Sequence, residues 1–380
     1  MSGTALIIGG GIAGLTAAVA MQQLGFDVRV YERYAEVRPV GAGIMVAPNA
    51  LQALDVLGLA HAVQTRGRRN NSMMILDRQG RTLSKIAASW QGRSIVTIHR
   101  ADLHQILLDA LKPGTLILGK SCLRVEQDGK RVTAIFADGS TDSGDLLVAA
   151  DGIHSPIRTQ LFPDIKPRYA GYTCWRGIAH NVSAQGICEW PTETWGGSGR
   201  FGIVPLPDDR IYWYALLNGP AEDSAFAQYK VRDLSEKFSG FHSPVSQVLA
   251  AMTDEQLIRN DIYDLPPLSR FASGRVLLIG DAAHAVTPNL GQGACQAIED
   301  GVMLMKCVAQ QPSIEAAFRS FELLRKQRVA MIAKRSLYIG KLAQLDRPLL
   351  CRLRDGMMRM IPDSMQRNQM TSLYKVDFAK

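Results

Sequence analysis

The chain has 380 residues, of which 47% are hydrophobic and 21% are charged, with a formal net charge of +8 at pH 7. This composition is typical of a globular protein long enough for two packed domains. Positive charge favours anionic partners such as a dinucleotide phosphate or a membrane surface. Lys and Arg are dispersed and no RNA- or DNA-binding module is present, so we expect no nucleic-acid function.

The cysteines and the N-terminus exclude two further classes. Six cysteines are scattered without C-x-x-C spacing, which predicts reduced thiols and neither a disulfide framework nor a metal site. The N-terminal apolar segment has no preceding Lys or Arg and is soon interrupted by glycines, which argues against a signal peptide or a membrane span. We therefore expect a cytoplasmic protein.

The N-terminus contains a complete βαβ pattern. A buried strand at 5–8 leads into Gly9-x-Gly11-x-x-Gly14, a helix follows, and a second strand ends at Glu32. Gly9 permits the tight turn, Gly11 lets a pyrophosphate approach the backbone, and Gly14 lets helix and strand pack closely. Glu32 can accept hydrogen bonds from a ribose diol and would repel a 2′-phosphate. This favours FAD or NAD over NADP as the tightly bound ligand, the alternative being a glycine turn without a ligand.

Two later segments also place an aspartate after a strand. The strand predicted at 146–150 is followed by Asp151-Gly152, and the strand predicted at 276–279 is followed closely by Asp281. These carboxylates would lie at the carboxyl ends of strands, where open α/β folds bind ligands. Asp281 could there bind a ribityl hydroxyl group.

The third motif continues through Pro288, Gly291, Gly293 and Ala294 into a predicted helix. The glycines leave backbone N–H groups free at the helix N-terminus, where they can face the anionic edge of a flavin.

With these three motifs in this order, the chain resembles the single-component FAD-dependent aromatic monooxygenases of the para-hydroxybenzoate hydroxylase fold, over its whole length. The resemblance implies an α/β fold with a Rossmann-type FAD-binding domain, a β-sheet substrate domain and C-terminal helices. It also implies that FAD, reduced by NADPH or NADH, reacts with O₂ to a flavin hydroperoxide that hydroxylates an aromatic or heteroaromatic ring. No second strand with a GxGxxG turn is present, so NAD(P)H is expected to bind transiently at the surface.

The resemblance also divides the chain. It implies an FAD-binding domain at 1–70, 97–165 and 263–310, a substrate domain at 71–96 and 166–262, and a C-terminal helical region at 311–380. The residues expected to bind FAD are Gly9, Gly11, Ile12, Ala13, Gly14, Glu32, Arg33, Arg38, Gly43, Arg100, Asp151, Gly152, Asp281, Pro288, Gly291, Gly293 and Ala294.

Two of these assignments have a plain structural alternative. Arg100 begins a predicted helix, where a solvated arginine is the alternative. Arg38 and Gly43 belong to the segment 38–44, which could also be an ordinary surface turn because it is rich in Gly and Pro.

The substrate side is predicted at a β-hairpin. Residues 200–206 and 210–216 flank Pro-Asp-Asp, and a turn near Asp208 would put Arg200 and Tyr212 on one face. Together the surrounding aromatic residues suit a flat apolar substrate, although we expect any single one of them to belong to the core.

Arg200 needs a partner because it is a charge beside an aromatic cluster. We expect Arg200, Tyr212 and Asn289 to orient the substrate and to ease its deprotonation.

Two subgroups of the family compete. Urate hydroxylases carry an arginine and a tyrosine on this hairpin, as Arg200 and Tyr212 do here, but an aspartate where this chain has Asn289. The 2-alkyl-4-quinolone 3-hydroxylases resemble the chain more closely, including 171–176 and 338–364. We therefore expect a 2-alkyl-4-quinolone-like substrate, with a urate or salicylate-type hydroxylase, or a flavin-dependent redox or binding protein without hydroxylase activity, as alternatives.

The C-terminus carries two basic, apolar segments. After Ser313 one long helix is predicted, and its expected packing side comprises Ile314, Phe318, Phe321, Leu324 and Ile332. Residues 347–362 interleave leucine and methionine with arginine, which would suit an interface with anionic lipid and weak contact of a cytoplasmic protein with the inner membrane. The alternative is a helix packed on the FAD-binding domain with a solvated basic face. We expect a monomer or a homodimer.

Overall fold

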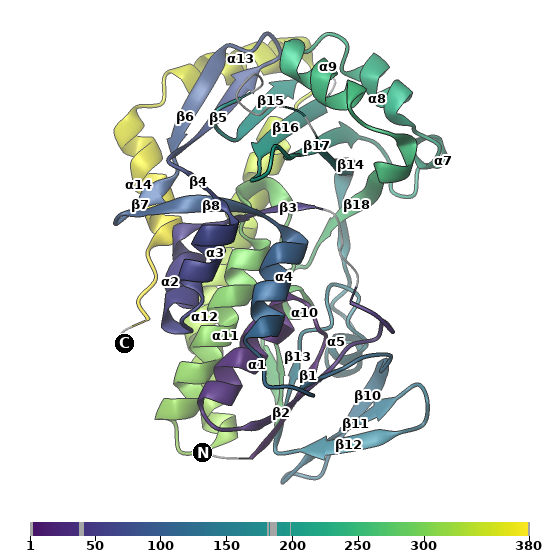
Figure 1. Ribbon diagram of the computed structural model, residues 1–380, viewed down its shortest axis with the longest axis vertical. Helices are drawn as coiled ribbons and strands as arrows, with labels where there is room; N and C mark the ends of the chain where they lie inside the picture. Colours follow the sequence, from purple (N-terminus) through teal and green to yellow (C-terminus); the bar gives the residue numbers. More distant parts are fainter. Residues whose placement is uncertain (1–2, 38–41, 181, 183–187, 198, 379–380) are drawn as a thin grey trace.

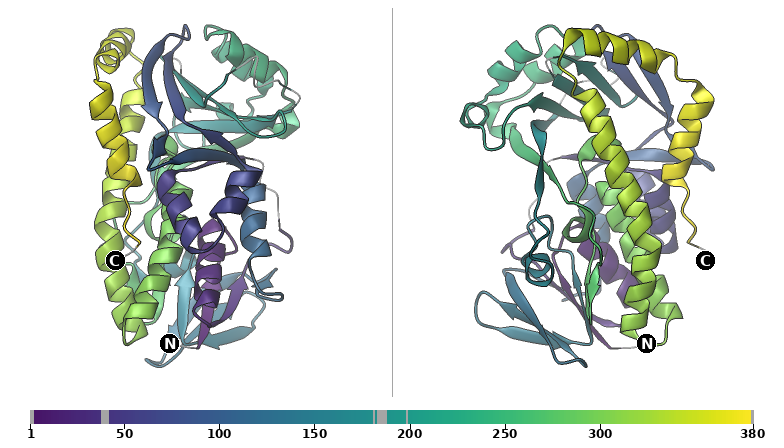
Figure 2. Two further views of the ribbon diagram at one scale, coloured as in Figure 1. Left: turned by 60° about the vertical axis from the view of Figure 1, so that its left-hand side comes forward. Right: turned by 180° about the vertical axis from the view of Figure 1, so that it is seen from behind.

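The computed structural model describes residues 3–37, 42–180, 182, 188–197 and 199–378. The molecule is elongated, with a parallel sheet in the lower half of Figure 1 and a large, mainly antiparallel sheet in the upper half. The long helix α12 (Ile314–Ala343) runs along both halves, as the rear view in Figure 2 shows.

The parallel sheet brings the three glycine motifs together. Its strands, in spatial order, are β19 (Ala272–Ser273), β20 (Val276–Leu278), β13 (Leu146–Ala149), β1 (Thr4–Ile8), β2 (Asp27–Tyr31) and β9 (Leu116–Ile117). All neighbours pair in parallel except β19 with β20. The strands predicted before the motifs are confirmed as β1, β13 and β20. Because they are parallel neighbours, their carboxyl ends meet at one edge.

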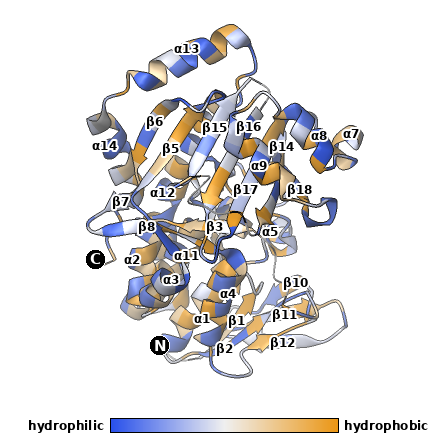
Figure 3. Ribbon diagram, turned by 45° about the horizontal axis from the view of Figure 1, so that its top comes forward, coloured by the Kyte–Doolittle hydropathy of each residue, from blue (hydrophilic) through white to orange (hydrophobic). Residues whose placement is uncertain are grey.

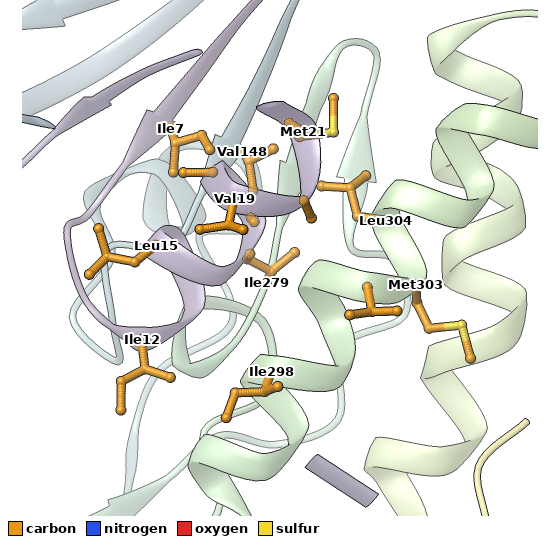
Figure 4. Close-up of a cluster of buried hydrophobic side chains, with 14 of the residues drawn as sticks. Ile7, Ile12, Leu15, Val19, Met21, Val148, Ile279, Ile298, Met303 and Leu304 are labelled. Atoms are coloured by element: carbon orange, nitrogen blue, oxygen red, sulfur yellow. The ribbon is translucent and has the colours of Figure 1, made fainter. Parts of the chain in front are cut away.

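Two helices pack together beside this sheet. They are α1 (Ile12–Gln23) and α11 (Gly293–Gln310), which follow the first and third motifs. A Cβ at Gly301 would lie 3.0 Å from the backbone nitrogen of Ala17, so glycine lets the helices approach closely. Figure 4 shows Ile7, Val148 and Ile298 within the resulting apolar cluster. Each such buried side chain stabilises the fold by roughly 1.5–3 kcal/mol.

The remaining elements of the lower half frame these motifs. Its other helices are α2 (Pro48–Val56), α3 (Ala60–Arg66), α4 (Arg100–Asp109), α5 (Pro156–Leu161), α10 (Asp281–His284) and the 3-10 helix η2 (Pro288–Leu290). A three-stranded sheet contains β10 (Cys122–Gln127), β11 (Val132–Phe136) and β12 (Thr141–Gly144). A four-stranded sheet, which lies between the two halves in Figure 1, contains β3 (Gly43–Val46), β8 (Arg93–His99), β4 (Arg68–Asn70) and β7 (Ser89–Trp90).

The large sheet contains the predicted hairpin. Its strands, in spatial order, are β18 (Ile258–Asp264), β14 (Arg168–Ala179), β17 (Ile211–Asn218), β16 (Gly199–Pro205), β15 (Thr192–Gly196), β5 (Ser72–Asp77) and β6 (Thr82–Ala87). Strands β16 and β17 are antiparallel, with Gly202 opposite Tyr214 and Val204 opposite Tyr212. Asp208 and Asp209 have positive φ angles of 60° and 49° in the connecting turn. The hairpin prediction is therefore confirmed.

The aromatic residues of this sheet lie in two groups, one on each face. Trp175, Phe201 and Trp213 lie on one face, and they form a core cluster with residues of the helices that cover it. These helices are α7 (Ser224–Ala227), α8 (Val231–Lys237) and α9 (Ser243–Ala250), and the 3-10 helix η1 (Asp254–Gln256) follows them. For these three aromatic residues the core alternative holds. Tyr212 and Tyr214 lie on the opposite face, here called the tyrosine face, together with Arg200.

The C-terminal helices continue α12 around the large sheet. The side chain of Ser313 caps α12 by accepting a hydrogen bond from the backbone N–H of Ala316. The predicted packing side of α12 is wrong at one position, because Leu324 is 53% exposed while Phe321 is buried. A break at 344–347 leads to α13 (Pro348–Arg359), and α14 (Asp363–Tyr374) follows.

Helix α13 does not lie where the packed-helix alternative put it. It packs against β6 of the large sheet rather than against the parallel sheet, and Met358 joins a cluster with Ile75 and Trp195. Among the described residues, no helix is both long enough and apolar enough to cross a membrane.

Candidate active site

The glycines of the first motif have different surroundings. A Cβ at Gly14 would overlap the carbonyl oxygen of Gly9, so the start of α1 lies directly against the turn. Gly9 itself has φ +108°, a conformation that side chains disfavour. At Gly11, by contrast, no described atom apart from those of its two chain neighbours lies within 4 Å of the Cβ position. Gly14 and Gly9 therefore serve packing, whereas Gly11, before Ile12 and Ala13 at the start of α1, leaves open space for a ligand.

Glu32 lies at the end of β2 against the same turn. Its carboxylate accepts hydrogen bonds from the backbone N–H groups of Gly10, at 2.8 Å, and Tyr34, at 3.1 Å. These bonds hold the acid beside the glycine turn. Arg33 points to the surface, where it contacts the ring of Tyr34. Arg38 lies outside the described residues.

Asp151 is a buried acid whose carboxylate oxygens are unsatisfied, although Ser155 and Arg158 lie near enough to lower its pKa. Both carboxylate oxygens are inaccessible and have no hydrogen-bond partner within the described chain. Burial raises the pKa of Asp151 to about 6. An unpaired buried carboxylate is costly, and the adjacent Gly152 has positive φ with no described atom within 4 Å of its Cβ position. The second motif therefore presents an unused acceptor group beside open space.

Asp281 is held by a charge network that the sequence did not reveal. Asp300 on α11 accepts hydrogen bonds from the backbone N–H of Gly280, at 2.8 Å, and from His284, at 2.6 Å. Arg325 on α12 pairs with Asp300 at 2.7 Å, and both side chains are fully buried. Burial opposes ionisation of Asp300, but His284 and Arg325 keep its pKa at about 2.

Glu299 and Asp300 are consecutive acids on α11, and their arginine partners both lie on the next helix, α12. Glu299 is fully buried and pairs with Arg325 and Arg328. Nothing in the local spacing predicts these contacts; a Glu-Asp pair within an apolar helical face was the only available signal. The network fixes the turn that presents Asp281 but does not itself face a ligand.

Asp281 and Arg100 lie within electrostatic range of each other. The side chain of Asp281 is exposed to solvent, but the protein packed around the carboxyl group desolvates it in part. This desolvation raises the pKa of Asp281, and the charges of His284 and Arg100 oppose the rise. Desolvation likewise lowers the pKa of Arg100, which begins α4 as predicted, and Asp281 counteracts this. The structure thus brings together the predicted residues Asp281 and Arg100.

Gly43 connects the cofactor side to the tyrosine face. A Cβ at Gly43 would lie 2.5 Å from the ring of Tyr212, so the ring packs directly on the β3 backbone. Tyr212 and Tyr214 are neighbours, with ring centroids 5.8 Å apart. The hairpin therefore packs against Gly43, at the end of the segment that is predicted to lie near the flavin ring.

The third motif ends at an uncapped helix. Pro288 begins η2, Gly291 has φ +61°, and α11 begins at Gly293 and Ala294 without a side-chain hydrogen bond to its first turn. Its N-terminal N–H groups thus keep their attraction for an anionic group.

Arg200 is the centre of a polar cluster on the tyrosine face. Its guanidinium donates to Glu193 at 2.9 Å, to Asn289 at 2.8 Å and to the side-chain oxygen of Gln344 at 2.9 Å. Tyr172 lies beside them, within hydrogen-bond distance of the Asn289 amide. The predicted residues Arg200 and Asn289 are therefore in direct contact.

Glu193 supplies the negative charge that Arg200 requires. The side chains of Arg200 and Glu193 are 2% and 8% exposed. The carboxylate also accepts hydrogen bonds from Tyr214, at 2.6 Å, and from Trp195, at 2.8 Å. Burial and the neighbouring Glu193 charge raise the pKa of Tyr214 well above its usual range. Glu193 was missed because only the pairing of β15 with β16 brings it beside the hairpin.

Tyr212 does not join this cluster. Burial raises its pKa strongly, and its charged neighbours are Arg176 and Arg100 rather than Arg200. The structure thus separates the three predicted substrate residues into an Arg200–Asn289 side and a Tyr212 side of the same face.

These features fit FAD. The open space at Gly11, the acid beside the glycine turn, the partnerless carboxylate of Asp151 and the uncapped α11 suit a molecule with a pyrophosphate, ribose hydroxyls and an electron-deficient ring. Which predicted residues touch FAD remains a prediction.

Known proteins are similar to this chain in sequence and in fold. The family described as "FAD binding domain" matches residues 3–331. An aurachin C monooxygenase/isomerase of Stigmatella aurantiaca is 35% identical over 362 residues, covering 94% of each chain. A 2-heptyl-3-hydroxy-4(1H)-quinolone synthase of Pseudomonas aeruginosa is 33% identical over 374 residues, covering 96% of each chain.

A solved structure of Klebsiella pneumoniae HpxO with FAD and uric acid superimposes with a TM-score of 0.90 at 32% identity, covering 98% of this chain and 96% of that one. The fold and the cofactor implied by the three motifs are thereby confirmed. The chain belongs to the FAD-binding-domain family and is a flavin-dependent aromatic monooxygenase.

Proposed function

We propose that the protein hydroxylates a neutral, N–H-bearing heteroaromatic ring of the 2-alkyl-4-quinolone type, using FAD, O₂ and NADPH or NADH. The observation that carries this proposal is the buried ion pair of Arg200 with Glu193 on the tyrosine face. It balances the charge that would otherwise attract an anionic ring. Taking a carboxylate or urate anion out of water without a free counter-charge is costly.

The hydrogen-bond directions favour a ring that donates. Because the Tyr214 hydroxyl donates its hydrogen bond to Glu193, the lone pairs of the Tyr214 oxygen can accept from other donors. A ring N–H can supply such a donor, and proton movement from that N–H toward Tyr214 and Glu193 would enrich the ring in electrons. FAD supplies hydride acceptance and oxygen activation when bound. The protein contributes orientation and excludes water.

The apolar part of the tyrosine face suits a substituted ring. Tyr172, Cys174 and Leu216 are buried in one cluster with Tyr214 packed against it. Flat aromatic and aliphatic walls with few polar groups are typical of sites for apolar rings. Arg200 and Asn289 border this cluster and would fix the orientation of the ring.

Urate is the second candidate. Arg200 and Tyr212 occupy the hairpin positions that the urate-hydroxylase subgroup fills with arginine and tyrosine, and the HpxO structure contains uric acid. Against urate stands Asn289, where that subgroup has an aspartate. A urate or salicylate-type activity therefore requires Arg200 to release Glu193.

The test uses the FAD-loaded protein with NADPH and NADH. We expect 2-heptyl-4-quinolone to stimulate NAD(P)H oxidation and to gain one oxygen atom by mass spectrometry, with urate and salicylate giving little. Stimulation by urate with formation of its hydroxylated product would overturn the substrate assignment. Oxidation that ignores every aromatic compound would instead favour a redox or binding protein without hydroxylase activity.

Three finer predictions belong to the same proposal. The domain boundaries, the choice between monomer and homodimer, and a peripheral position at the inner membrane stay predictions. The exposed surface of 347–362 supports the last of these and suggests how such contact would occur.

A further inference from the structure

Helix α13 exposes its apolar side chains. Leu349 is 69% exposed, Leu353 is 56%, Met357 is 65% and Met360 is 74%, and Leu350 lies beside them at 40%. At 100° per residue these five positions cover one continuous face of the helix. An ordinary surface helix turns such a face toward the core.

The opposite face of α13 is anchored by an arginine. Arg354 is 3% exposed, lies over the ring of Trp195 at 5.2 Å and donates to the carbonyl oxygen of Ala343 at 3.2 Å. Cys351 and Met358 are buried on the same side. The orientation of α13 is therefore fixed by these contacts, and the apolar face is not needed to hold it.

The adjoining helices also expose apolar side chains. Leu342 on α12 is 42% exposed and Met365 on α14 is 52% exposed. Figure 3 shows α13 as the outermost element at its end of the molecule. We call Leu342, Leu349, Leu350, Leu353, Met357, Met360 and Met365 the apolar ridge. Contiguous exposed apolar surface of this kind marks an interaction site.

Cations border the apolar ridge. Lys341, Arg347, Arg352 and Arg367 are exposed around it, and Arg359 lies beside it on α13, where it also reaches Asp77 at 2.8 Å. The whole chain carries a net charge of +8. Leucine and methionine next to arginine and lysine match the boundary between acyl chains and anionic headgroups.

We propose that the apolar ridge docks α13 flat on an anionic membrane surface, inserting the leucine and methionine side chains while the flanking arginines bind lipid headgroups. A second copy of the chain is a poorer occupant, because a two-fold contact brings identical surfaces together and would oppose the arginines of both copies. Anionic lipid instead complements them, because its headgroups attract each Lys or Arg near the surface.

The ridge is also coupled to the tyrosine face. Gln344, at the end of α12, accepts from Arg200 through its side-chain oxygen and from Asn218 through its carbonyl oxygen, both at 2.9 Å. A docked membrane would therefore lie close to the residues proposed to orient the substrate. The docking itself does not depend on which ring is hydroxylated.

The experiment is flotation of the full-length, FAD-loaded protein with vesicles of neutral phosphatidylcholine, alone or mixed with phosphatidylglycerol. We expect binding to the mixed vesicles that falls as salt rises. The double variant Leu353→Ser/Met357→Ser should bind about tenfold or more weakly, because it removes inserted apolar surface. Arg352→Glu should weaken binding to the mixed vesicles.

Two control variants test whether the effect depends on the position of the substitution within the apolar ridge. Leu323→Ser changes an 81% exposed leucine on α12 outside the ridge, and Lys130→Glu changes an exposed cation on the β10–β11 turn. Both should bind like the unchanged protein. No binding to the mixed vesicles, or equal binding by the ridge and control variants, would overturn the proposal. Dimerisation that Leu353→Ser/Met357→Ser abolishes, without vesicle binding, would assign the ridge to a second copy instead.

Discussion

Glu193 and Arg200 lie on neighbouring strands of the large sheet, β15 and β16, and form an ion pair of 2.9 Å on its tyrosine face. Breaking such a buried pair from one side leaves an uncompensated charge and costs about 3–5 kcal/mol. The pair makes the tyrosine face polar, but the charge of Arg200 is balanced by that of Glu193.

Glu193→Gln should change which rings bind. Glutamine keeps the size of the side chain but leaves Arg200 with an unbalanced positive charge. We expect urate and salicylate to bind about tenfold or more tightly relative to 2-heptyl-4-quinolone than they do in the unchanged protein. Titration of the FAD absorbance measures these dissociation constants. Glu126→Gln, at an exposed ion pair on β10, is the control, and an unchanged preference would contradict the charge argument.

Tyr214→Phe should remove recognition of a ring N–H. The hydroxyl donates to Glu193 at 2.6 Å, so its loss also leaves one carboxylate oxygen unsatisfied, at a cost of about 1–3 kcal/mol in the free energy of unfolding. Steady-state kinetics should show that the unchanged protein prefers an N–H quinolone over its N-methyl analogue and that the variant does not. Tyr338→Phe, an exposed tyrosine on α12, should keep the preference. Equal discrimination in both variants would exclude Tyr214 from substrate contact.

Gly11→Ala and Gly14→Ala should have different consequences. The Cβ position at Gly11 meets no described atom within 4 Å, so the variant should fold and lose FAD affinity. At Gly14 the added methyl would overlap the carbonyl oxygen of Gly9, and the variant should be less stable before FAD is added. Thermal unfolding of FAD-free protein and fluorescence titration with FAD separate the effects. A Gly11→Ala variant that binds FAD normally would contradict the pyrophosphate assignment.

Asp151→Asn should change the pH dependence of stability in the FAD-free protein. Burial raises the pKa of Asp151 to about 6, so the folded state binds more protons than the unfolded state between the usual aspartate pKa and that value. Stability contributed by this group therefore decreases as pH rises from about 4 to about 6 and is constant above. The variant should gain stability relative to the unchanged protein over this window, by up to about 3 kcal/mol.

Urea unfolding at several pH values measures this difference. Asp164→Asn, at an exposed aspartate, is the control and should show no such gain. A constant difference between Asp151→Asn and the unchanged protein across the window would mean that the buried carboxyl ionises normally.

Local chemistry explains why much of the cofactor side was predictable. The strand before Gly9, the helix that begins after Gly11 and the strand ending beside Glu32 follow from hydrophobic periodicity and glycine spacing within a few dozen residues. The β16–β17 hairpin was predictable for the same reason, because a two-residue alternation flanks a short turn. Each of these signals is contained in one continuous stretch.

The partners of buried charges were not predictable in this way. Arg200 was expected to need a partner, but Glu193, Asn289 and Gln344 come from three other segments. Asp300 likewise reaches Arg325 only through the packing of α11 against α12, and it reaches Gly280 only because α11 lies beside the turn after β20. Such contacts depend on strand pairing and helix packing, which residue spacing along the chain does not encode.

By itself the sequence determined the three glycine motifs, their order and the family to which they belong, because turn geometry and nucleotide binding require particular residues at fixed spacing. The tertiary structure decided which charges are neutralised and which apolar residues face outward. In α13 both leucine and arginine were visible, yet Arg354 is buried and Leu353 exposed. The reason is that burial depends on what the helix packs against: Trp195, from a distant strand, offers a ring to the arginine.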